Sequence, residues 1–237
     1  MALNYTIWTN QLANLMAAVS SDPNFVTFQP GAIDYAEQRI YRELNPIANQ
    51  VRDSSASLTS SSRTFALPTS VGTFVSVQAV NVITPSSQTL TTGGSRVKLA
   101  PSSLNMLDFL YPTEISSGVP SLFAIVDNAT IAVGPTPNSS YQIEVIGTIR
   151  PAPLSASNSS TYLTQNLPDL FFAATAIFAA GYMRDFGMQA DNPQMSQSWE
   201  NQYKLLFQTA AQEEIRKTFN TTFPSVFTAP PTSGGPV

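Results

Sequence analysis

The chain has 237 residues and contains neither histidine nor cysteine, which excludes enzymes that use a histidine base or a cysteine thiolate, and metal sites built from these side chains. Charged residues make up 11% of the chain, against about 25% in ordinary globular proteins. The net charge is −4 and the cations are scattered, which argues against a sequence-specific nucleic-acid-binding protein.

Most of the polar surface must therefore come from serine, threonine, asparagine and glutamine, which are abundant throughout. Neutral hydroxyls and amides can be buried against another protein at a smaller desolvation cost than charges. This composition favours a subunit with large interfaces, although a secreted or viral β-rich protein would share it. A carboxylate metal site and a serine or lysine nucleophile remain open, but no phosphate-binding loop or facing pair of carboxylates is present.

Hydrophobic spacing predicts two helices at the N-terminus. Ile7, Trp8 and Leu12 begin a three- and four-residue pattern that continues to Val19, and residues 20–23 should end this helix. Pro30 suits the first turn of a second helix, which Asn45-Pro46 should stop. The first residues lack the basic and apolar regions of a signal peptide.

The middle of the chain predicts a β domain. Short β-branched runs alternate with turn residues, and the expected strands cover residues 64–67, 74–83, 96–99, 122–126, 130–133 and 141–149. A helical turn is expected within residues 104–110. Several short strands with frequent turns are typical of an antiparallel β-sandwich or open barrel.

Helical patterns return after a linker at residues 151–160. Residues 170–183 are almost entirely apolar but too short for the ~20 residues that span a bilayer, so they predict a buried helix, capped by Asn166 and closed by Gly187. Asn192-Pro193 then opens an amphipathic helix whose apolar residues step by three or four: Met195, Trp199, Tyr203, Leu206 and Ala210.

These elements predict an α+β fold. Residues 1–46 and 151–219 would form two helical hairpins that pack together like a four-helix bundle, because each apolar face needs a partner. Residues 47–150 would be an inserted β domain, and residues 220–237 an extended tail.

The tail carries an aromatic side chain at every fourth position, Phe219, Phe223 and Phe227. Purely disordered segments are poor in aromatic residues. The tail is therefore expected either to dock on another subunit or to fold back over its own domain.

Other candidate contact residues lie in the helices and in one predicted strand. Trp8, Tyr182, Trp199 and Tyr203 are expected in the core or at a subunit interface. Arg96 and Lys98 alternate with apolar residues, so they could face a DNA channel or form a solvated strand face that discourages edge pairing.

The order of several segments resembles the head-to-tail adaptor proteins of tailed bacteriophages, including those called tail tubular protein A. The segments that carry this resemblance are residues 35–44, 65–68, 74–77, 118–125, 131–137, 162–170 and 199–203. The resemblance implies a ring, usually of twelve copies, that docks beneath the portal protein, receives the tail or nozzle protein and surrounds double-stranded DNA. Such a protein has no catalytic site, cofactor, metal or membrane contact, and belongs to the neck of a virion assembled in the bacterial host cytoplasm.

A second hypothesis comes from a different class of proteins. The β domain could recognise a glycan or a receptor at a surface, with the helices acting as an oligomerising stalk. Exposed aromatic residues that converge on one β face would favour this binding module. A ring with an open centre would favour the adaptor.

Overall fold

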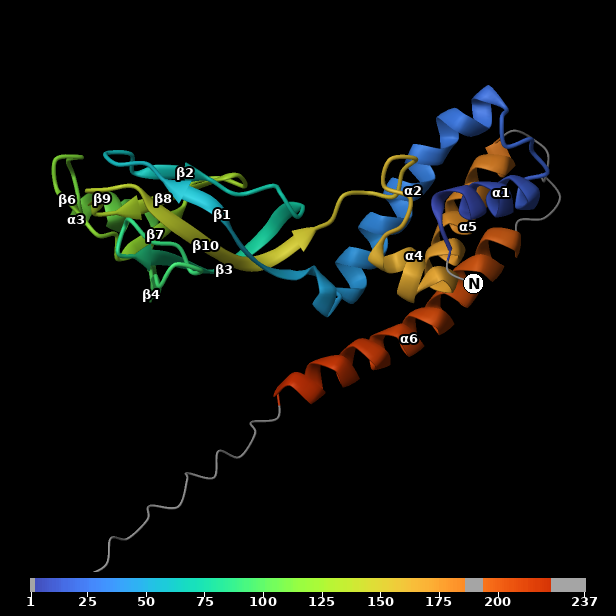
Figure 1. Ribbon diagram of the computed structural model, residues 1–237. Coiled ribbons are helices and arrows are strands. Elements are labelled where there is room, and N and C mark those ends of the chain that lie inside the picture. Colours follow the sequence, from blue (N-terminus) through green and yellow to red (C-terminus); the bar gives the residue numbers. More distant parts are fainter. Residues whose placement is uncertain (1–2, 186–193, 223–237) are drawn as a thin grey trace, which may run out of the picture.

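The computed structural model describes residues 3–185 and 194–222. The fold is α+β, as predicted, and these residues form two lobes (Figure 1). The helical lobe contains α1, α2, α4, α5 and α6, and the β lobe contains the strands and the short helix α3. The chain enters the β lobe after α2 and returns to the helical lobe after β10.

The first helix, α1 (Tyr5–Leu15), begins where the Asn4 side chain accepts the Ile7 N–H. It ends earlier than predicted, because the chain turns at Ala17 with a φ of 50°, in the left-handed region where a helix cannot continue. The last part of the predicted helix, from the end of α1 to Val19, is therefore not helical in the structure.

The second helix, α2 (Pro23–Leu44), begins two turns before the predicted start at Pro30. Asp22 caps it by accepting the N–H groups of Asn24 and Phe25, and Pro23 occupies the first turn. Pro30 lies inside the helix, on an exposed face. The Val26 carbonyl receives no N–H from Pro30, and Val26 is 50% exposed, while the added turns bury Phe25 and Phe28.

Two four-stranded sheets form the β lobe. The first has the antiparallel order β1 (Gln50–Leu58), β10 (Tyr141–Arg150), β3 (Thr73–Thr84) and β4 (Ser95–Lys98). The second has the order β2 (Thr64–Ala66), β8 (Thr130–Gly134), β7 (Leu122–Ile125) and β5 (Ala100–Pro101). Short parallel pairs join β5 to β7 and β6 (Ser117–Gly118) to β9 (Thr136–Pro137), where only antiparallel pairing was expected.

The β lobe has its own apolar core, which draws side chains from both sheets. Leu58, Val80, Val82, Leu99, Ile131, Val133, Ile143 and Val145 are fully buried there. The helix α3 (Leu104–Leu110) covers one end and buries only Leu107. The predicted strands and helical turn are thus confirmed, and β1 and the short strands β5, β6 and β9 are additions.

The C-terminal helices are α4 (Tyr162–Asn166), α5 (Pro168–Asp185) and α6 (Gln194–Thr222). Asn166 does not cap α5 as predicted; it ends α4, and its amide donates to the Tyr162 carbonyl. The expected end at Gly187 and start at Asn192 lie outside the described residues.

The helix α5 is the buried helix of the helical lobe, as its composition predicts. Phe171, Ala174, Ala176 and Ala179 have no exposed surface, and α5 lies against α2, α4 and α6. Residues 151–160 form a loop that buries Leu154 against the same core. The four-helix-bundle arrangement and the domain boundaries stay predictions.

Candidate docking surfaces

Two of the candidate aromatic residues lie in the core of the helical lobe. Trp8 has no exposed surface, and its indole N–H donates to Thr175 Oγ1 at 3.2 Å. Tyr203 is 1% exposed, and its hydroxyl donates to Glu43 Oε2 at 2.7 Å. Both side chains join helices that are far apart in sequence.

The other two are half-buried at the edge of the same core. The Tyr182 ring lies 4.6 Å from that of Phe28, and the Trp199 ring meets Phe172 edge-on at 6.3 Å between centroids. The structure thus gives each of these rings a partner within the chain.

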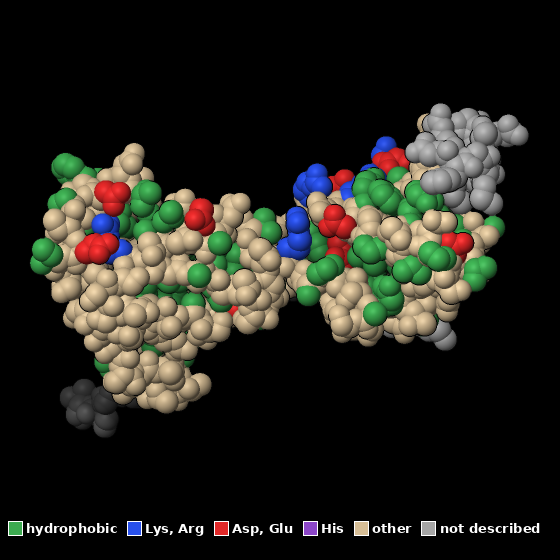
Figure 2. Space-filling model, turned by 90° about the horizontal axis from the view of Figure 1, so that it is seen from above, with side chains coloured by type: hydrophobic (Ala, Val, Ile, Leu, Met, Phe, Trp, Pro, Cys, Tyr) green, Lys and Arg blue, Asp and Glu red, His purple; other side chains and the backbone are tan. Residues whose placement is uncertain are grey.

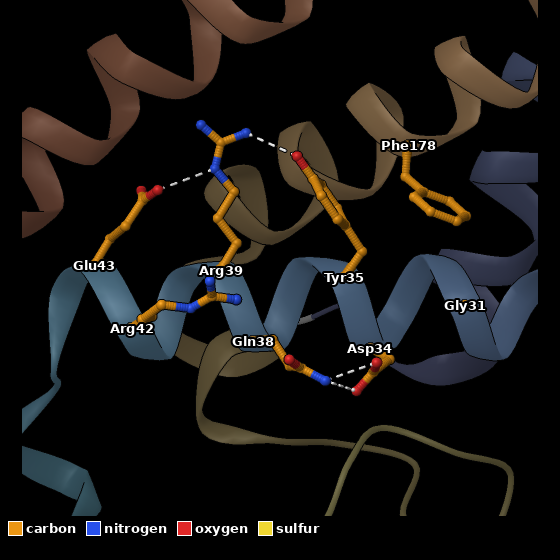
Figure 3. Close-up of a pocket in the computed structure, with 8 residues that line it drawn as sticks. All are labelled: Gly31, Asp34, Tyr35, Gln38, Arg39, Arg42, Glu43 and Phe178. Carbon is orange, nitrogen blue, oxygen red and sulfur yellow. Dashed lines mark hydrogen bonds and ion pairs between the residues drawn. The ribbon is translucent and has the colours of Figure 1, made fainter.

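A hollow with a volume of ≈ 600 Å³ runs along α2 (Figure 3). We call it the α2 hollow; its lining residues are Gly31, Asp34, Tyr35, Gln38, Arg39, Arg42, Glu43 and Phe178. Both carboxylate oxygens of Asp34 accept from the Gln38 amide at 2.7 Å, as Figure 3 shows. The hollow has free space at Gly31, since an added Cβ would meet only the Phe178 ring, at an ordinary contact distance of 3.6 Å.

Arg39 closes one side of the α2 hollow by joining α2 to α6. Its guanidinium donates to both oxygens of Glu200, at 2.8 and 2.7 Å, and lies 4.1 Å above the centre of the Tyr203 ring. This bidentate contact holds the pKa of Glu200 below its usual range and raises that of Arg39. Arg39 was not among the residues predicted from the sequence, although its i,i+4 spacing to Glu43 would have indicated an ion pair.

Arg96 and Lys98 lie on β4, an edge strand. The Arg96 Nε donates to both oxygens of Glu144, at 3.1 and 2.9 Å, and Asn81 donates to the same carboxylate at 2.8 Å. Arg52 approaches it to 3.9 Å. Arg96 is therefore bound to Glu144 although its side chain is 47% exposed, and Lys98 is exposed on the same strand.

The Glu144 side chain is 1% exposed. Burial alone would raise its pKa, but the hydrogen bonds from Arg96 and Asn81 and the nearby positive charges hold the pKa below its usual value. Sequence reasoning missed Glu144 and Arg52, because only strand pairing brings them beside Arg96.

The free end of the β lobe carries an exposed apolar patch, which we call the α3 tip. Phe109 is 78% exposed and Ile115 is 89% exposed, and Met106 and Leu110 lie with them on or beside α3. Figure 2 shows hydrophobic side chains among charged ones at this end. Grouped apolar side chains on a surface mark contacts with other proteins. The sequence predicted a helix here, but it did not predict that its apolar side chains are exposed.

Glu37 is a buried carboxyl where the chain returns from the β lobe. It is 4% exposed, and its Oε1 accepts the Leu154 N–H at 2.9 Å. Burial raises its pKa to about 7; the nearby Asp34 charge adds to this rise, while the hydrogen bond and Arg150 oppose it.

The predicted tail residues fall at the limit of the structure. Phe219 lies within the bounds of α6, and Phe223 and Phe227 lie outside the described residues. Within residues 3–185 and 194–222, no cluster of acidic side chains is arranged to hold a metal ion. Over the same residues, no helix combines the length and apolarity that crossing a membrane requires.

Comparison with known protein families gives a match over most of the chain. A family model described as SU10 adaptor protein matches residues 9–224. The matched range includes both lobes and the segments from residue 35 to residue 203 that carry the resemblance found in the sequence. The search of curated proteins gave no match.

Proposed function

Because the chain belongs to the SU10 adaptor protein family, a family of phage head-to-tail adaptors, we propose that it forms a ring between the portal and the tail. The ring has twelve copies, surrounds double-stranded DNA and resembles that of tail tubular protein A. The family match over residues 9–224 is the observation that carries this proposal.

The surfaces of the two lobes support the proposal. The α3 tip lies at the far end of the β lobe from the helices (Figure 1), so the molecule can meet different partners at its two ends. The α2 hollow and a row of exposed uncharged residues on α6 suit contacts between copies.

The role of this protein is mechanical rather than catalytic. It joins the head to the tail and seals the channel, and its place is the neck of a virion assembled in the host cytoplasm. Arg52 and Arg96 share the one carboxylate of Glu144, and Lys98 is exposed two residues after Arg96 on β4, so positive charge is in excess there. That excess suits a face turned towards the phosphates of passing DNA.

One observation weighs against the surface binding module. In the β lobe, residues 50–150, Phe109 is the one exposed aromatic side chain. A glycan site built on a β face would be expected to gather several such rings on that face.

Co-sedimentation with the purified portal ring of the same phage tests the head-to-tail role. We expect the full chain to sediment with the portal, and a chain truncated after Phe219 to keep its fold but attach more weakly, because residues 220–237 dock on the portal. Unchanged attachment of the truncated chain would remove that role from the tail. A full chain that never sediments with the portal would rule out the head-to-tail adaptor.

A further inference from the structure

The outward face of α6 carries a regular stripe of uncharged side chains. Six exposed residues follow one another at intervals of three, four, three, four and three positions: Ser198, Asn201, Leu205, Gln208, Gln212 and Ile215. We call them the α6 stripe. They lie opposite the face that buries Tyr203, Ala210 and Glu214. This spacing keeps side chains in line along a helix and is typical of a seam with a second helix.

The α6 stripe contains two large apolar side chains that are exposed to solvent. Leu205 is 66% exposed and Ile215 is 54% exposed, about 15 Å apart at ~1.5 Å per residue. The four residues between and before them are neutral amides or a hydroxyl, so no charge in the stripe would have to be desolvated. A flanking cation, Lys204, is 65% exposed and lies 3.7 Å from Glu200 Oε1 of its own helix.

The α2 hollow has the matching features. Gly31 leaves room beside the Phe178 ring, which is 36% exposed. Asp34 lies one turn away, on the exposed side of α2, and its carboxylate contacts the neutral Gln38 amide. In the hollow, whose lining also includes Arg39 and Arg42, the recess at Gly31 lies beside the carboxylate of Asp34. On the stripe, the apolar side chain of Leu205 correspondingly lies beside a cation.

We propose that α6 of one copy packs against α2 of the next copy, with Leu205 entering the α2 hollow beside Gly31 and Lys204 pairing with Asp34. The contact rests on the proposed ring and names its lateral interface. Since it joins two different surfaces of the same chain, it is heterologous, and such contacts repeat from copy to copy and form a closed ring when the rotation between copies completes a full turn.

The absence of cysteine from the chain makes disulfide trapping a direct test. In the double variant Gly31→Cys with Leu205→Cys, mild oxidation should give a ladder of cross-linked copies on a denaturing gel. Each single variant should stay uncross-linked. Cross-linked dimers from Leu205→Cys alone would show α6 against α6 and overturn the proposal, as would a double variant that gives no ladder while rings are present.

Charge reversal tests the polar half of the contact by native mass spectrometry. Lys204→Glu and Asp34→Lys should each reduce the ring fraction at least tenfold, and the two together should restore it. Lys98→Glu, the same reversal on the β lobe, is the matched control and should keep the wild-type ring. Circular dichroism checks that each variant is folded.

The outcomes separate this contact from the function on which it rests. Rings that persist in both single reversals, or singles that the double variant does not rescue, would overturn the contact and leave the ring intact as a proposal. A wild-type chain that stays monomeric at every concentration would overturn the contact, while its sedimentation with the portal would still decide the adaptor role.

Discussion

Glu144, Glu200 and Glu214 each contact a cation within the fold, and their side chains are 1%, 28% and 8% exposed. In each case burial works to raise the pKa, yet contacts with cations and other donors hold it below the usual value. Charged residues are only 11% of this chain, and these three glutamates connect different helices or strands. Glu37 differs, because its closest donor is a backbone N–H and its pKa is raised.

The raised pKa of Glu37 predicts a loss of stability as the pH rises. The pKa is about 7 in the folded protein and 4.5 in the reference state, so between these values the folded chain holds the extra proton. The free energy of unfolding should therefore fall from pH 4.5 to above pH 7, by at most about 3 kcal/mol. Glu37→Gln keeps an oxygen acceptor for the Leu154 N–H and removes the charge, so its stability should change less over this range.

Urea unfolding at pH 5 and pH 8 measures this difference. Wild type should lose more stability than Glu37→Gln between the two values, and at pH 8 the variant should be the more stable. Glu114→Gln, an exposed carboxyl in the β lobe, is the matched control and should keep the wild-type dependence. Parallel pH profiles for wild type and Glu37→Gln would contradict the assignment.

At the scale of elements, Arg39 joins two helices that meet over a limited contact. Its guanidinium binds Glu200 and lies over Tyr203, both on α6, while Tyr203 returns a hydrogen bond to Glu43 on α2. The Arg39 side chain is 18% exposed, so solvent screens the ion pair between Arg39 and Glu200 less than it screens an ion pair on the surface. Arg39 and Tyr203 thus both hold α6 against α2.

Arg39→Met should destabilise the protein by about 2–3 kcal/mol, because it leaves the partly buried Glu200 without its bidentate partner. Arg42→Met, on the exposed side of the same helix, should change stability by less than about 0.5 kcal/mol. Equilibrium unfolding in urea compares the two. Equal effects would show that the contact between Arg39 and Glu200 contributes nothing specific.

Elements with strong local signals could be predicted from the sequence. A continuous apolar run predicts α5, hydrophobic periodicity predicts α6, and β-branched runs bounded by turn residues predict β3, β7, β8 and β10. The strand β1 could not be predicted, because Asp53 and the two serines after it interrupt any alternation, and the strand bulges between Asp53 and Ala56. Pairing with β10 determines that strand.

The candidate surfaces show the same limit. Sequence spacing finds Trp8 and Tyr203 as helix residues with an apolar face, and the structure buries them. The exposure of Phe109 and the coupling of Arg96 to Glu144 depend on how distant segments pack. Those contacts follow from tertiary structure, which no local pattern specifies.

At the scale of the whole molecule, two apolar cores divide the chain between the lobes. Two segments join the lobes, one through the 3₁₀ helix Ile47–Asn49 and one after β10. Glu214 of α6 accepts the Ile47 N–H at 3.1 Å, so the last helix also contacts the first crossing. The α3 tip, the α2 hollow and the α6 stripe face outwards from this frame.

The central claim is that copies of this chain close into a ring around DNA. Native mass spectrometry combined with negative-stain imaging of the purified protein tests it most directly. We predict a closed ring of about twelve copies with an open centre wide enough for duplex DNA, because the adaptor family implies such a ring and heterologous contacts form one when the rotation between copies completes a full turn. A compact trimer without a channel would contradict the account and favour the surface binding module.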